Sequence, residues 1–200
     1  MAIHKILGAT AICAIVLGVG GTNPVSAEGL DYNNFISLGY ADGEQEYNLG
    51  SATLELDQED VGLGFSAMIA PNVSLGFGYT DGELENLDYE VFFLHSKFYL
   101  KTDGVNPYAI LSWADLDIDG SIFEDDDATS YGVGIDILNA ETGVLFRAEM
   151  TTNSDIDYSI GLGAEFMWDN FGLAFGIARV EGEDNFGSAD GISIALKSYF

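Results

Sequence analysis

Large apolar residues alternate with small or polar residues along most of the chain after residue 33. Between residues 61 and 69 the large apolar side chains alternate with glycine, serine or methionine, and the same pattern resumes at 73–80. Further runs of this kind lie at 131–137, 144–150, 158–168 and 171–177. A period of two predicts β-strands with one apolar face, not amphipathic helices.

The second face of these strands carries unusually small side chains. Glycine, serine and alanine stand opposite a broad band of aromatic and aliphatic residues, whereas the outer face of a water-soluble sandwich favours Thr, Lys and Glu. This pattern indicates a closed barrel that is apolar outside and crowded inside. A water-soluble up-and-down barrel is the alternative, but its apolar face would point inward and leave glycines facing water.

The connections between the expected strands alternate between short and long. Short turns are expected at 70–72, 102–106, 140–143 and 169–170, and long acidic segments at about 42–60, 80–90, 115–130, 151–157 and 179–190. Short turns at one end and long loops at the other are typical of outer-membrane barrels. Nine connections predict ten antiparallel strands in one up-and-down barrel, with eight strands as the alternative. An even number of strands places both termini on one side, which we expect to be periplasmic.

Charged residues are distributed unevenly along the chain. The chain has 33 Asp and Glu against 6 Lys and Arg, and a formal charge of -27, although 48% of it is apolar. This balance excludes nucleic acid as a partner, because phosphates require clustered Lys and Arg, and the 25 Phe, Tyr and Trp residues argue against disorder. Of the acids, 25 fall in the five long segments, which predicts acidic loops outside the cell.

The first 27 residues have the layout of a secretory signal peptide. A short basic start with His4 and Lys5 precedes an apolar run, and small residues at 25–27 suit signal peptidase. The expected mature protein, residues 28–200, is one barrel domain with 33 acids, 5 bases and no cysteine. Disulfide and cysteine chemistry are therefore excluded for the mature chain.

The C-terminal strand carries the most specific local signal. Ile192, Ile194, Leu196 and Phe200 share one face, and the chain ends in Tyr199-Phe200. In alternation, turns and terminal aromatic residue, the sequence resembles small bacterial outer-membrane barrels of the OmpA/OmpX type, with porin-like character. The resemblance implies the outer membrane of a Gram-negative bacterium, recognition of Tyr199 and Phe200 by the barrel-assembly machinery, contact with membrane lipid and lipopolysaccharide, and a monomer.

Several ionisable side chains are expected inside this barrel. The alternation directs them to the lumen, where buried charges must be paired, so we expect a salt-bridge network. Its predicted members are His95, Lys97, Lys101, Asp136, Arg147, Glu149, Glu165 and Lys197. A satisfied polar plug is favoured over a gated water or ion path. Arg179 departs from this rule, because its phase points it outward, toward a lipopolysaccharide phosphate, unless a bulge turns it inward.

Enzymatic chemistry finds little support. A hydrolase at the outer rim needs a base close to an acid or a serine, and His95, the single histidine of the expected mature chain, is placed near mid-membrane. The predicted function is therefore non-enzymatic: an envelope protein that displays acidic loops toward cations, lipopolysaccharide or other surfaces. A small passive channel is the second hypothesis, and an enzyme is the third.

One acidic segment resembles a calcium loop of the EF-hand kind. Asp115, Asp117 and Asp119 occupy positions 1, 3 and 5, with Asp126 at position 12. The segment lacks the usual bidentate Glu and flanking helices, and Leu116 and Ile118 continue a strand alternation. Calcium or magnesium held more loosely by acidic segments is the broader expectation, and no other cofactor is expected.

Overall fold

The computed structural model describes residues 33–48, 53–85, 87–100, 104–118, 126–139, 141–154, 156–182 and 186–200. In these ranges no helix has the length and apolar character that a membrane crossing requires. The expected signal peptide at 1–27 lies outside the described residues, as do Lys101 and Asp119.

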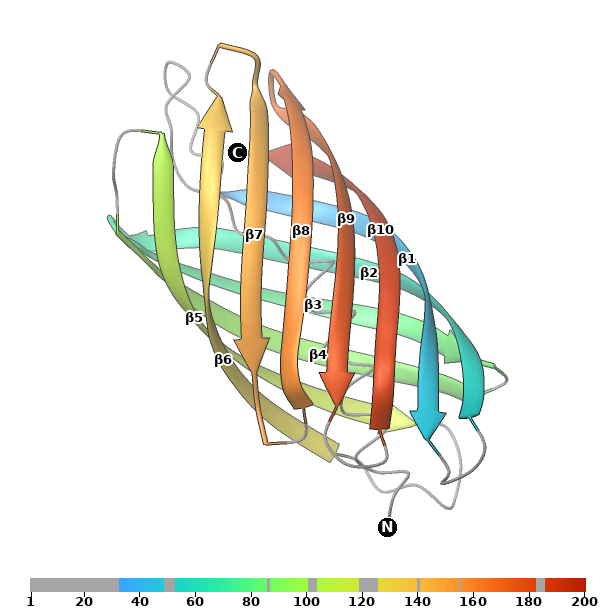
Figure 1. Cartoon of the computed structure of the whole chain (residues 1–200). Helices are drawn as coiled ribbons and strands as arrows, with labels where there is room; N and C mark the ends of the chain where they lie inside the picture. Colours follow the sequence, from blue (N-terminus) through green and yellow to red (C-terminus); the bar gives the residue numbers. More distant parts are fainter. Residues whose placement is uncertain are drawn as a thin grey trace.

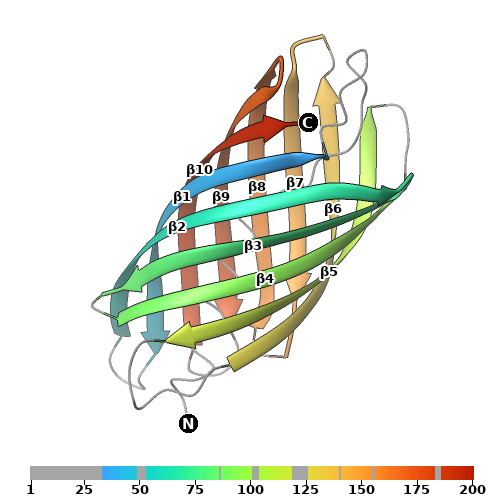
Figure 2. The ribbon, with the colours of Figure 1, turned by 180° about the vertical axis from the view of Figure 1, so that it is seen from behind.

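Ten strands form one closed antiparallel barrel (Figure 1, Figure 2). Each strand pairs with its neighbours in sequence, and β1 pairs with β10 to close the sheet. The ten-stranded up-and-down barrel predicted from the sequence is confirmed, and the eight-stranded alternative is wrong. The strands are β1 (Phe35–Asn48), β2 (Thr53–Ala70), β3 (Val73–Leu84), β4 (Leu87–Tyr99), β5 (Val105–Ile118), β6 (Asp126–Asn139), β7 (Val144–Thr152), β8 (Ile156–Trp168), β9 (Phe171–Gly182) and β10 (Phe186–Tyr199).

The first and last strands meet where the barrel closes. Phe35 lies opposite Tyr199 in the β1–β10 register, and their rings are in edge contact with centroids 6.2 Å apart. The backbone N–H of Phe200 donates to the carbonyl oxygen of Asn34 at 3.1 Å. The Phe200 ring points outward and stacks on Phe65, with centroids 5.8 Å apart. The terminal aromatic pair thus covers the seam on both its inner and its outer face.

Four short connections define one end of the barrel, which we call the short-turn end. β2 and β3 are joined through Pro71 and Asn72, and β8 and β9 through Asp169 and Asn170. Asp169 has a φ of 49°, a left-handed conformation that Asp tolerates better than most residues. The turn expected at 102–106 is displaced by two residues toward the N-terminus, because β4 ends at Tyr99 and β5 begins at Val105.

A belt of large apolar side chains encircles the outside of the barrel on this half. Its members come from every strand and leave a third to two thirds of their surface exposed. They include Ile36, Leu38, Val61, Leu63, Phe77, Phe92, Phe98, Leu111, Val133, Phe146, Leu162, Phe166, Phe175, Ile177, Ile192 and Leu196. An exposed apolar surface this continuous is expected only where lipid or a partner covers it.

At the other end of the barrel, the acidic segments are mostly strand, which corrects the prediction of acidic loops. β3 and β4 continue to Leu84 and Leu87, so residues 85–86 alone connect them, and β1 and β2 extend to Asn48 and Thr53. We call the outward acids of these extensions the acidic collar. They are Asp42, Glu44, Glu46, Glu55, Asp57, Glu59, Asp81, Glu83, Asp88, Glu90, Asp115, Asp117, Asp127, Glu181 and Asp190.

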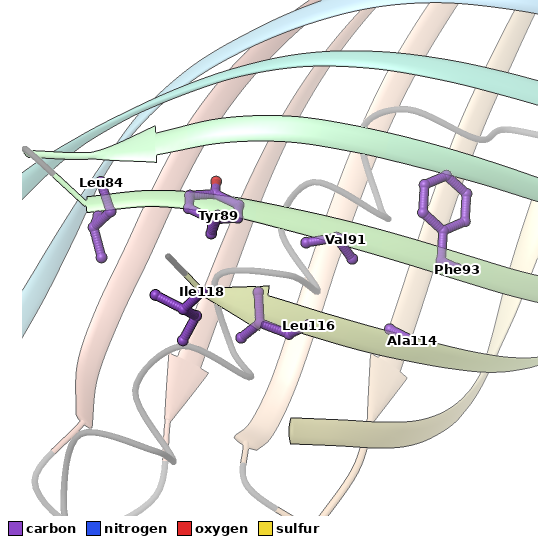
Figure 3. Close-up of a cluster of buried hydrophobic side chains, with 7 residues drawn as sticks. All are labelled: Leu84, Tyr89, Val91, Phe93, Ala114, Leu116 and Ile118. Atoms are coloured by element: carbon purple, nitrogen blue, oxygen red, sulfur yellow. The ribbon is translucent and has the colours of Figure 1, made fainter. Parts of the chain in front are cut away.

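The strands remain paired through the collar because the side-chain pattern reverses its phase there. Behind the outward acids, the inward positions of β3, β4 and β5 are apolar and form a buried cluster (Figure 3). The cluster consists of Leu84, Tyr89, Val91, Phe93, Ala114, Leu116 and Ile118. In the belt, large apolar residues point outward; in the collar, they point inward and carboxylates meet solvent. Ladder hydrogen bonds then continue where a loop was expected.

Part of the lumen is filled from one wall, although long side chains also enter it from β7, β8 and β10. Inward positions of β4, β5 and β6 carry long side chains, among them Lys97, Tyr99, Tyr108 and Asp136. The facing positions of β8, β9 and β10 are small: Gly161, Gly163, Ala174, Gly176, Ser193 and Ala195. Large residues on one wall therefore occupy the space that small residues on the other wall leave.

Gly78 on β3 tests this packing. A Cβ added there would lie 2.7 Å from the carbonyl oxygen of Leu63 and would also overlap the Phe93 ring. Because backbone must then move, we expect Gly78→Ala to lower the free energy of unfolding by about 1–3 kcal/mol, measured by urea titration of refolded protein in micelles. Gly39→Ala is the control, since its nearest atom would lie at 3.4 Å. Equal midpoints for the two variants would contradict the packing described.

Candidate functional site

The lumen holds seven of the eight ionisable residues expected there. His95 and Lys97 come from β4, Asp136 from β6, Arg147 and Glu149 from β7, Glu165 from β8 and Lys197 from β10. The strand alternation sends each of them inward, and all but Arg147 expose 9% or less of their surface. Lys101, the eighth, lies outside the described residues.

One ion pair crosses the lumen between strands that are not neighbours. The Nζ of Lys97 on β4 donates to Oε2 of Glu149 on β7 at 2.7 Å. The hydroxyl of Tyr108 donates to the same oxygen at 2.8 Å, and Lys97 Nζ lies 4.4 Å from the centre of the Tyr108 ring. The carboxylate of Glu149 thus joins three strands across the interior.

Two further ion pairs complete the group. Arg147 donates from Nε to Oδ1 of Asp136 at 2.9 Å, and these residues are direct partners in the β6–β7 register. Lys197 donates to Oε2 of Glu165 at 2.7 Å and lies 4.5 Å from the centre of the Phe35 ring. Three cations and three carboxylates therefore balance one another in an interior where unpaired charges would be strongly destabilising.

The ion pairs and tyrosines, which we call the plug, border a small cavity. A cavity of about 50 Å³ lies against the small-residue wall of β8 to β10 and is lined by Arg147, Glu149, Glu165 and Lys197 among others. This volume holds a few water molecules. Oε1 of Glu165, which lacks a hydrogen-bond partner, is placed to bind one of them. The plug thus spans the lumen from β4 to β7.

His95 takes no part in these three ion pairs. Its side chain is 1% exposed, packs over Gly76 on β3, and has no hydrogen-bond partner at either ring nitrogen. A catalytic base needs a positioned proton donor or acceptor and access to substrate. The described geometry provides His95 with neither.

The described part of the segment that resembles a calcium loop, residues 115–118 and 126, is strand. Asp115 and Asp117 lie on β5 and point outward, and Leu116 pairs with Asp126 of β6. An extended, paired strand does not have the coiled backbone by which an EF-hand loop gathers its ligands. Asp119 lies outside the described residues, and no group of three or more metal-ligating side chains occurs among those that are described.

A second polar network, not expected from the sequence, lies inside the collar. Nε2 of Gln58 donates to Oδ2 of Asp60 at 2.6 Å and lies 2.7 Å from the Tyr89 hydroxyl, which also donates to Asp60. Gln45 donates to Gln58 at 2.8 Å. Asp60 precedes Val61, where the apolar belt of β2 begins. Burial raises the pKa of Asp60 to about 6, against the opposing effect of the hydrogen bonds from Tyr89 and Gln58.

The collar brings like charges together on the outer surface. Register places carboxylates directly opposite one another in the pairs Asp42–Glu59, Glu44–Asp57, Glu44–Asp190, Glu46–Glu55, Glu59–Glu83, Asp81–Glu90, Glu83–Asp88, Glu90–Asp117 and Asp115–Asp127. Like charges at opposed positions destabilise a sheet. Among the described residues, one cation faces this surface: Arg179 points outward as its phase predicts, and contacts Glu181 at 2.6 Å and Asp190 at 3.2 Å.

Comparison with known proteins identifies the fold. No family model matches the chain, and no curated protein matches it in sequence. Among solved structures, an outer membrane channel from Pseudomonas putida F1 is similar over 91% of this chain and 99% of its own, with 7% identity and a TM-score of 0.56. The translocator domain of the autotransporter NalP from Neisseria meningitidis is similar over 100% and 96%, with 11% identity and a TM-score of 0.53. The chain shares the fold of bacterial outer-membrane β-barrels.

The buried carboxyl of Asp60 predicts a pH effect on stability. Because its pKa is raised from 3.8 to about 6, the folded state favours the protonated acid. The resulting stabilisation is complete below about pH 4 and is lost as the pH rises through 6. Asp60→Asn should remove this part of the pH dependence. The free energy of unfolding of the wild type minus that of the variant, measured by urea titration, should therefore change between pH 4 and 7. A constant difference over that range would contradict the assignment.

Proposed function

We propose that the chain is a non-enzymatic outer-membrane β-barrel protein with a closed lumen, whose acidic collar contacts divalent cations and lipopolysaccharide at the cell surface. The two solved structures compared above are a channel and a translocator domain, so the fold alone does not select a role. The proposal therefore depends on the apolar belt, the plug and the collar.

The apolar belt supports the membrane location. Its exposed side chains occur on all ten strands, as lipid requires of a spanning barrel. Short turns at one end of the belt and long acidic hairpins at the other favour an orientation with the short-turn end periplasmic and the collar outside. The secretory layout of residues 1–27 is consistent with export.

The observation that carries the closed lumen is the ion pair between Lys97 and Glu149. It joins β4 to β7 across the interior, and both side chains are buried. An ion moving through the barrel would have to displace this pair and leave its partners unpaired, which costs about 3–5 kcal/mol for a buried pair. A passive channel, the second function considered, would require the plug to rearrange.

The cross-strand acids support the contact with cations. A set of opposed carboxylates without matching cations repels itself, and divalent ions relieve that repulsion. Lipopolysaccharide is itself anionic, so Mg²⁺ or Ca²⁺ can bridge its phosphates to the collar. The collar is held on strands, and its carboxylates therefore keep a fixed spacing toward such ions.

Electrical recording tests the closed lumen. After reconstitution into planar bilayers at neutral pH, the wild-type protein should show no stepwise currents. Lys97→Ala combined with Glu149→Ala removes both partners of the crossing pair and should produce small, discrete currents. Glu141→Gln, in the exposed 141–143 turn, is the matched control and should stay silent. Regular single-channel steps in the wild type would refute the closed lumen.

Magnesium titration tests the collar. In micelles that contain lipopolysaccharide, Mg²⁺ at about five times its Kd should raise the free energy of unfolding by about 1 kcal/mol. Asp81→Asn with Glu90→Gln neutralises one opposed pair and should reduce that gain, while Glu141→Gln should not. An equal gain with NaCl at matched ionic strength would show screening alone and contradict cation bridging.

A further inference from the structure

A row of small residues lies where four neighbouring strands pass from belt to collar. Gly43 of β1 pairs with Gly191 of β10, Gly191 with Ala178 of β9, and Ala178 with Gly161 of β8. A Cβ added at Gly43 would lie 2.6 Å from the carbonyl oxygen of Asp190, so these backbones approach closely. A side chain at Gly43 would therefore push β1 and β10 apart.

The outer surface over this row is hollowed into a groove. Its volume is about 570 Å³, within the range of sites that hold small molecules. It is lined by Asp42, Gly43, Glu44, Ile160, Leu162, Ile177, Ala178, Arg179, Asp190, Gly191 and Ile192. The groove opens outward on β8, β9, β10 and β1, in contrast to the plug and its cavity, which lie inside the barrel.

The groove has two chemically distinct halves. On the belt side lie Ile160, Leu162, Ile177 and Ile192, which are 41%, 50%, 55% and 60% exposed and present a purely aliphatic surface. On the collar side lie Asp42, Glu44 and Asp190, with Glu44 directly opposite Asp190 in the β1–β10 register. An occupant must therefore be apolar at one end and able to satisfy carboxylates at the other.

Arg179 does not make the charged half attractive to anions. Its guanidinium already contacts Glu181 at 2.6 Å and Asp190 at 3.2 Å, and these carboxylates raise the pKa of Arg179 above its usual value. Asp42 and Glu44 form no ion pair with any residue that the structure describes. The four acids around one arginine leave a net negative rim, which complements a cation.

We infer that this groove binds a cationic amphiphile, with its alkyl chain along the four aliphatic residues and its ammonium head among Asp42, Glu44 and Asp190. An ordinary anionic lipid would place its phosphate against the same carboxylates. The inference goes beyond the proposed function, because it assigns an organic ligand to one sector of the collar. It shares with that function only the outward position of these acids.

Photolabelling of the purified full-length protein in dodecyl maltoside micelles tests this site. The probe is dodecylamine with a diazirine on its chain, and the matched neutral probe is dodecanol with the same tag. We expect the amine to label peptides around Ile160, Ile177 and Ile192 at least fivefold more than the alcohol does. Equal labelling by both probes, or labelling spread evenly around the belt, would overturn the inference.

Variants separate the groove from general attraction to the collar. Asp42→Asn with Asp190→Asn should reduce labelling by the amine roughly five- to tenfold, as expected for two exposed charge contacts. Ile177→Trp, which fills the groove and leaves its charges intact, should also reduce it. Asp115→Asn with Asp117→Asn removes two collar acids on β5 and should change labelling less than twofold. An equal loss in that control would overturn the inference, whether or not Mg²⁺ bridging or the closed lumen holds.

Discussion

Closure of the sheet is the constraint on which the structure depends. Once β1 pairs with β10, every strand has two neighbours, no strand edge is left to find partners, and each side chain must point either outward or inward. The belt, the collar, the plug and the groove are consequences of that two-way choice, repeated along ten strands. A slip of one residue in any strand would exchange its inward and outward sets.

The same rule explains what the sequence could and could not predict. Alternation and the short turns were sufficient to predict the number of strands and the inward orientation of Lys97, Arg147 and Glu149. The partner of Lys97 was out of reach, because Glu149 lies three strands away and its proximity depends on how the barrel curves. Tyr108, which donates to the same carboxylate, was missed because a tyrosine at an inward position has no distinctive spacing.

The collar was misinterpreted for a different reason. Dense acids suggest solvated loops, yet the residues between them, such as Leu84, Leu116 and Ile118, keep the period of two with inverted phase. Attention to the uncharged positions alone would have extended β3, β4 and β5 to their observed ends. The buried Gln58–Asp60–Tyr89 network belongs to this same inner face, and its contacts depend on the β2–β4 neighbourhood, which no local pattern encodes.

The seam between Phe35 and Tyr199 has a consequence for folding kinetics. These partners stand at opposite ends of the described chain, so the pairing that removes the last strand edges has the largest sequence separation in the sheet. Contacts between residues so far apart in sequence form slowly, because the chain loses the entropy of closing the loop before the contact stabilises it. Until that pairing forms, β1 and β10 each keep an unpaired edge that is open to edge-to-edge association.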